Sequence, residues 1–522
     1  MKIYLKAITV SLGLVGAISL PAFADSRIES DTHSVKKLSS QQLEQQLNQL
    51  QKEVSELQKQ LRMPSSSSTH STKHLKVPHT PSARTAPDNL TSKPFQSIED
   101  FPIDMDVPGK SFVSSGPYIG IPVVYSGSNL IINSPSVNED VILLGMRKTI
   151  HNRLVALGRQ EEADHSHILL SGIVEGQGSY QDKGTGGNPS DLDLTSANLD
   201  AYVLGPSEWT SALIELGYDN SNGINSGTFN SNSRSQNSRV YVNKAFIVIG
   251  NFLRSPFYSS LGQMYVPFGT YATTMITNPM TTTLARTKDR ALVLGYAEQA
   301  ANALYASLFA FRGDSHASAT SHINNGGINI GYKFKQDKWG GNIGGGVLAN
   351  LADSSGMQYT GNSPYFGGFG GANGSGQEKI VHRVPAYDVR GQFSFKDNID
   401  LIGEYITAST AFNPNDMSVN THGAKPQALH TEAVYTFQNL IHPVSAAVAY
   451  DMSKDALAIG LPAKRYSFMV NTSFWRDTLQ TVELRHDINY SGNNTSSGSS
   501  IPSFNGTGKS DNVITAQFDV YF

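Results

Sequence analysis

The chain has 522 residues, a formal net charge of −3 and no cysteine. The near-neutral charge gives no basic surface for nucleic acid, and the lack of cysteine excludes disulfides, thiolate metal sites and cysteine nucleophiles. Charged residues make up only 16% of the sequence, whereas about a quarter is usual for soluble domains. The composition is therefore low in charge for a soluble protein of this size.

Residues 1–24 have the pattern of a secretory signal peptide. Lys2 and Lys6 supply the positive charges before the apolar run 7–20, and the Ala-Phe-Ala of residues 22–24 is typical of a cleavage site. The apolar run is too short for a membrane-spanning helix, and no later segment reaches about 18 consecutive apolar residues. The sequence therefore predicts export, with the mature chain starting in the periplasm.

Residues 25–62 are predicted to form a periplasmic coiled-coil helix. Apolar side chains recur there at alternating spacings of four and three residues, at Leu43, Leu47, Leu50, Val54, Leu57 and Leu61. Such a seam is buried only against partner helices, so the simplest expectation is a homo-oligomer. A lone amphipathic helix packed on another element is the alternative.

Two segments separate this helix from the rest of the chain. Residues 63–95, rich in Ser, Thr and Pro, are predicted to be a disordered linker, and we expect no metal site among their scattered histidines. Residues 96–165 are predicted to be a small periplasmic or barrel-mouth segment, with a helix from Glu139 to Gly158. This segment is far shorter than the plug domain of an energy-coupled receptor.

Residues 166–522 alternate with a period of two, which is typical of β-strands. In the final strand the apolar Ile514, Ala516, Phe518, Val520 and Phe522 alternate with Thr515, Gln517, Asp519 and Tyr521. In a barrel, this alternation puts an apolar face on lipid and a polar face on the lumen. We count about sixteen strands, which start near residues 167, 190, 207, 238, 257, 290, 301, 324, 339, 383, 398, 425, 441, 464, 478 and 510.

Connection lengths distinguish this pattern from a soluble sandwich. Short connections such as 335–338 and 396–398 alternate with long ones such as 219–237, 352–382 and 490–510. Short periplasmic turns and long extracellular loops are typical of outer-membrane barrels. The predicted fold is therefore all-β, a transmembrane antiparallel β-barrel of about sixteen strands in the outer membrane of a Gram-negative bacterium, preceded by the periplasmic coiled-coil helix.

No enzyme motif stands in the sequence. It has no Gly-x-Ser-x-Gly elbow, no His-Glu-x-x-His pair and no Walker loop. We therefore expect a protein without catalysis, cofactor or metal.

Six cations are the candidate solute-binding residues. The long connection 268–289 ends near Arg286, Lys288 and Arg290. In many porins this loop folds inward and narrows the channel, which would place these cations at the constriction; the alternative is a solvated loop end. By the strand alternation Lys333, Arg390 and Arg485 point into the lumen, near Asp388, Glu483 and Asp487. There they could bind an anionic solute or brace the wall as ion pairs.

Nearly the whole chain resembles the LbtU-type siderophore porins. The most specific part is Ser136-Val137-Asn138-Glu139-Asp140, and the stretches Pro267-Phe268-Gly269 and Asn278-Pro279-Met280-Thr281 fit as well, as do the coiled coil and linker. The resemblance implies that a ferric siderophore passes through a barrel without an energy-coupled plug, with outer-membrane lipid as the other partner. The alternatives are a general porin for small solutes, a siderophore-independent iron importer, or a surface adhesin or envelope tether.

Overall fold

The computed structural model describes residues 104–107, 111–115, 138–156 and 158, and most of 165–522. The gaps after residue 165 are 206, 220–238, 318–321, 359–368, 370–378, 397, 438–439, 441, 443, 476 and 499–500. All described residues belong to one compact unit, residues 81–522. The predicted signal peptide, coiled coil and linker lie outside the described residues.

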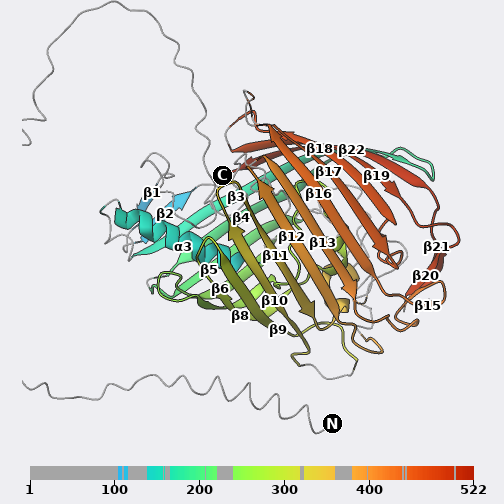
Figure 1. The fold of residues 1–522 in the computed structure, drawn as a ribbon, viewed down its shortest axis with the longest axis horizontal. Coiled ribbons are helices and arrows are strands. Elements are labelled where there is room, and N and C mark those ends of the chain that lie inside the picture. Colours follow the sequence, from blue (N-terminus) through green and yellow to red (C-terminus); the bar gives the residue numbers. More distant parts are fainter. Residues whose placement is uncertain are drawn as a thin grey trace, which may run out of the picture. The chain divides into compact units, whose positions relative to one another are not determined.

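Sixteen antiparallel strands close into a barrel (Figure 1). The last strand pairs with the first, from Tyr521 opposite Ile173 to Asp511 opposite Lys183. The strands are β3 (Ser166–Lys183), β4 (Ser190–Leu204), β5 (Thr210–Asp219), β6 (Arg239–Gly250), β7 (Phe257–Tyr265), β8 (Lys288–Ala297), β9 (Ala303–Phe311), β10 (Asn325–Lys335), β11 (Trp339–Leu348), β12 (Ala386–Phe395), β13 (Ile399–Ala408), β16 (Gln427–Phe437), β17 (Val444–Lys454), β18 (Lys464–Thr472), β19 (Thr478–Ile488) and β22 (Ser510–Tyr521). The predicted barrel is confirmed, and each predicted strand start lies within three residues of the observed one.

The period of two explains why these segments form a membrane barrel. In β12 the side chains of Tyr387 and Val389 are 48% and 67% exposed, whereas those of Asp388 and Arg390 between them are 2% and 5% exposed. An apolar outer face and a polar inner face are what lipid outside and a polar interior require. The chain is therefore an outer-membrane β-barrel. Among the described helices, none has the length and apolar character needed to cross a membrane.

The two ends of the barrel differ in their connections. At the short-turn end, strands are joined by residues 205–209, 251–256, 298–302, 336–338, 396–398, 438–443 and 473–477. At the long-loop end, the connections are 184–189, 220–238, 266–287, 312–324, 349–385, 409–426, 455–463 and 489–509. All of these except 184–189 follow the predicted alternation of short turns and long loops.

Short elements accompany the barrel at both ends. At the short-turn end, β1 (Asp104–Val107) pairs with β2 (Ser111–Ser115), and β2 runs parallel to the start of β3. The long loops carry α5 (Met280–Ala285), η5 (Leu351–Asp353) and α6 (Ser355–Gln358). They also carry a separate four-stranded sheet made of β14 (Met417–Val419), β15 (His422–Gly423), β20 (Thr495–Gly498) and β21 (Ile501–Asn505).

The hydrophobic core lies inside the barrel. Helix α3 (Glu139–Ala156), which matches the helix predicted from Glu139 to Gly158, contributes Leu143 and Leu144 to this core. The loop between β7 and β8 contributes Met280 and Leu284, and the loop before β12 contributes Met357. These side chains pack against inward-facing residues such as Tyr202, Leu213, Phe246 and Val248. Part of the lumen is therefore filled by the protein itself.

Candidate functional site

Residues 266–287, named here the constriction loop, fold into the barrel rather than away from it. Phe268, Tyr271, Met280 and Leu284 on this loop are almost completely buried. The loop leaves β7, passes through the lumen and returns to β8, and α5 lies in its second half. For the connection 268–289, the sequence left open an inward fold and a solvated loop end, and the structure shows the inward fold.

Three glutamates on the wall hold the constriction loop. Glu404 on β13 accepts the Thr270 backbone N–H at 2.6 Å, and Glu432 on β16 accepts that of Thr274 at 3.0 Å. Glu483 on β19 accepts the Thr277 backbone N–H at 2.9 Å. A loop inside a barrel has no ladder partner for its N–H groups, and carboxylates form strong, charge-assisted hydrogen bonds with them. These three residues, named here the glutamate row, fix the path of the loop across the lumen.

Cations on the same wall complete the contact. Arg465 donates to the carbonyl oxygen of Asn278 at 3.3 Å, and Arg485 donates to the Thr277 hydroxyl oxygen at 3.0 Å. His430 lies between two acids, with its Nδ1 3.0 Å from Asp451 Oδ1 and its Nε2 3.3 Å from Glu432 Oε2. Acids and bases therefore alternate where the tip of the loop meets the wall.

The structure places Lys333, Arg390 and Arg485 on the inner face, as the strand alternation predicted. Arg390 pairs with Asp388 and donates to the side-chain oxygen of Asn329, so it braces the wall. Arg485 pairs with Asp487 at 3.1 Å, in addition to its contact with the loop. Lys333 is exposed, with its ammonium nitrogen 5.8 Å from the centre of the Tyr305 ring. Lys333 is thus the most accessible of these three cations.

Of the other three predicted cations, Arg286 and Lys288 lie over the same Tyr265 ring, and Arg290 lies apart from them. Arg286 is half-buried, with its guanidinium 5.0 Å from the centre of the Tyr265 ring. Lys288 donates to the side-chain oxygen of Asn243 at 2.7 Å. Arg290 is exposed, as are Leu292 and Leu294 on the same face of β8. This places Arg290 on the outer face of the barrel. The structure therefore does not bring Arg290 to the constriction.

The N-terminal turns of α3 lie inside the lumen against β4 to β7. The Lys244 ammonium on β6 is 2.8 Å from Glu139 Oε1 and 2.5 Å from Glu215 Oε2. The Ser260 hydroxyl on β7 donates to Asp140 at 2.8 Å. Burial raises the pKa of Asp140 to about 6, although the hydrogen bonds from Ser260 and from the Val141 backbone N–H oppose the shift. The buried Asp140 carboxyl is therefore harder to ionise than an exposed aspartate.

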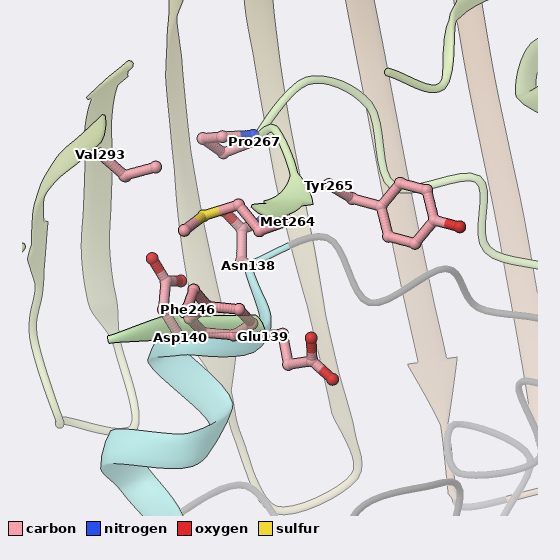
Figure 2. Close-up of a pocket in the computed structure, with 8 residues that line it drawn as sticks. All are labelled: Asn138, Glu139, Asp140, Phe246, Met264, Tyr265, Pro267 and Val293. Carbon is pink, nitrogen blue, oxygen red and sulfur yellow. The ribbon is translucent and has the colours of Figure 1, made fainter. Parts of the chain in front are cut away.

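The tip of α3 meets the base of the constriction loop, as Figure 2 shows. Asn138, Glu139 and Asp140 line a small cavity together with residues of β7 and of the loop, among them Met264 and Pro267. The backbone of Asn138 has φ 60°, a left-handed conformation that asparagine tolerates better than most residues. Loop and helix are thus neighbours within one lumen.

Sequence reasoning missed both the glutamate row and the position of α3. One signal for the helix was available: Lys244 stands alone in the apolar stretch of β6, and the acidic pair Glu139-Asp140 precedes the apolar residues 141–144. A lone inward-facing lysine needs an acidic partner. For the glutamate row, the only signal was the inward register of Glu404, Glu432 and Glu483, which does not reveal the loop as their partner.

Comparisons with known proteins give relatives along most of the chain, although no protein-family model matches it. A UPF0422 protein of Coxiella burnetii is 39% identical over 417 residues, which are 79% of this chain and 84% of that protein. A UPF0422 protein of Legionella pneumophila strain Lens is 35% identical over 453 residues, 85% of this chain and 82% of that protein.

Among solved structures, the outer membrane channel DcaP of Acinetobacter baumannii has a TM-score of 0.43 at 14% identity, covering 68% of this chain and 97% of its own. The anion-selective porin from Comamonas acidovorans has a TM-score of 0.43 at 11% identity, covering 68% of this chain and 100% of its own.

Proposed function

The chain belongs to the UPF0422 family, and we propose that it passes a ferric siderophore across the outer membrane through its barrel, without an energy-coupled plug and without chemistry. Its partners are then the siderophore and the membrane lipid. The N-terminal region lies in the periplasm, after removal of residues 1–24, and the coiled coil of residues 25–62 joins copies of the chain into an oligomer.

The observation that carries a channel role is the constriction loop held across the lumen by the glutamate row. A loop anchored by Glu404, Glu432 and Glu483 sets the size and the charge of the passage at one level of the barrel. Selectivity in pores comes from the radius and from the charged side chains at such a level. A structural tether would have no need of a loop anchored in this way.

Two features support an anionic iron complex as the solute. Lys333 presents an accessible ammonium group on the inner wall, and Arg485 lies at the tip of the constriction loop. Carboxylate-rich complexes are attracted by such cations, weakly enough in water to be released again. The resemblance to the LbtU-type siderophore porins, most specific at residues 136–140, supports the same solute.

Uptake of iron by cells tests the proposal. A strain lacking this gene is supplied with the wild-type chain, with Lys333→Glu, or with Lys338→Glu as the matched control, since Lys338 is exposed in the short turn 336–338. We expect Lys333→Glu to lower saturable uptake of a radiolabelled ferric carboxylate siderophore about tenfold, equivalent to ~1.4 kcal/mol. Lys338→Glu should have no effect.

Uptake of a small neutral sugar, measured in parallel, separates the alternatives. If loss of the gene abolishes iron uptake and leaves sugar uptake unchanged, the siderophore proposal stands. If both fall together, the chain is a general porin. If neither changes, transport is the wrong function, and the adhesin or tether alternative takes its place.

A further inference from the structure

Helix α3 enters the barrel from the short-turn end by about two turns. Asp140 bonds Ser260, near the middle of β7, whereas the Arg147 guanidinium donates to the carbonyl oxygens of Ser207 and Thr210 at 2.7 and 3.0 Å, at the turn that joins β4 to β5. Seven residues of helix separate these anchors, a rise of about 10 Å. The first part of α3 therefore occupies the lumen, and the second part extends toward the rim.

The barrel wall keeps its own charge pairing when the helix is taken away. Lys244 contacts Glu215 at 2.5 Å as well as Glu139, and Asp200 lies opposite Glu215 in the strand register. A buried ammonium group without any partner would be strongly destabilising. Because Glu215 remains, withdrawal of α3 leaves no buried cation without an acidic partner. Glu139 and Asp140 become hydrated as they leave. Charge pairing in the wall therefore does not oppose withdrawal of the helix.

The tip of the helix is connected to the constriction. The Asn329 amide on β10 donates to the Asn138 side-chain oxygen at 3.2 Å, and the Asn329 oxygen accepts from Arg390. Arg390 in turn pairs with Asp388 on the same strand. Movement of Arg390 would therefore change the position of Asn329, which holds the tip of α3.

We propose that the N-terminal half of α3 is a removable plug: it leaves the lumen when solute passes, and the link Asn138–Asn329–Arg390 holds its tip in place until then. This rests on the proposed channel function.

A reversible disulfide tests the plug, since the natural sequence has no cysteine to interfere. Asp140→Cys with Ser260→Cys joins the helix to the wall where their side chains meet. The control, Ser260→Cys with Val293→Cys, joins register partners on β7 and β8 and leaves the helix free. We expect oxidation of the first pair to lower ion conductance in planar bilayers at least tenfold, with recovery on reduction. Oxidation of the control pair should leave conductance unchanged.

Labelling of a buried position measures withdrawal without reference to transport. Leu144 is 1% exposed, so Leu144→Cys should react with a membrane-impermeant maleimide only when α3 leaves the lumen. Adding Asn329→Ala should raise the labelling rate severalfold. Adding Asn471→Ala, a buried inner-wall asparagine on β18, should not.

The outcomes separate the plug from the channel. Equal conductance of the oxidised and reduced Asp140→Cys/Ser260→Cys protein, with Leu144→Cys unlabelled, overturns the plug and leaves the channel in place. Absence of conductance in every form, the wild type included, overturns the channel function and the plug with it. An equal labelling rate with and without Asn329→Ala overturns the holding role of the link Asn138–Asn329–Arg390.

Discussion

At the scale of the residue, Arg390 and Lys333 show how neighbours divide inward-facing cations into two roles. Both lie on the inner face of the barrel wall, Arg390 on β12 and Lys333 on β10. Arg390 is buried between Asp388 and Asn329, so its charge is already compensated. Lys333 is exposed and lies over the Tyr305 ring, so its charge remains accessible to a solute. We therefore assign a bracing role to Arg390 and solute contact to Lys333.

This division predicts different effects of neutral substitutions on stability. Arg390→Gln leaves Asp388 buried without its cation, so the free energy of unfolding should fall by ~3–5 kcal/mol. Lys333→Gln removes an exposed charge, and its effect should stay within about 0.5 kcal/mol. Denaturant unfolding of the refolded barrel in detergent measures both. Equal effects of the two substitutions would contradict the assignment.

At the scale of the element, the constriction loop depends on the wall opposite its own strands. Glu432 accepts the Thr273 hydroxyl at 2.6 Å and the Thr274 backbone N–H at 3.0 Å. The acceptor of these bonds lies on β16, far around the barrel from β7 and β8 where the loop begins and ends. The path of the loop is therefore a property of the closed barrel rather than of the loop sequence alone.

Weakening one of these anchors should widen the passage. Glu432→Gln keeps the side-chain shape but removes the charge and one acceptor, which costs about 1–3 kcal/mol of loop anchoring. We expect larger and noisier single-channel conductance in planar bilayers. Glu298→Gln, in the exposed turn 298–302, is the matched control and should conduct as the wild type does. Unchanged conductance of Glu432→Gln would mean that the loop does not limit the passage.

At the scale of the whole molecule, the two faces of the barrel wall meet different solvents. Val389 points outward from the middle of β12 and is 67% exposed, while Gln392 lies on the inner face of the same strand. Exposure of an aliphatic side chain to that degree is stable because lipid surrounds the barrel.

Arginine placed on each face should report this difference. Val389→Arg puts a charge into the hydrocarbon region and should lower stability by ~2–4 kcal/mol in lipid vesicles. Gln392→Arg puts the same side chain into the polar interior and should change stability much less. The measurement is reversible unfolding in vesicles of a bilayer-forming lipid. If Gln392→Arg were the more damaging variant, the assignment of the two faces would be inverted.

The amino-acid sequence by itself determined the features that repeat along the chain. A period of two predicts the sixteen strands, their starts and the inward positions of Lys333, Arg390 and Arg485. The reason is that polar and apolar residues alternate along each strand, so the sequence shows which face is polar. The helix that begins at Glu139 could likewise be predicted from its own segment.

Only the tertiary structure decided which of these residues meet. Thr270 and Glu404 are 134 residues apart, and Thr277 and Glu483 are 206 residues apart, so no local pattern pairs them. The entry of α3 into the lumen, the partners of Arg390 and the outward position of Arg290 likewise depend on how the closed barrel brings its strands around one interior. Closure is a global property, and contacts across a lumen exist only once the last strand has joined the first.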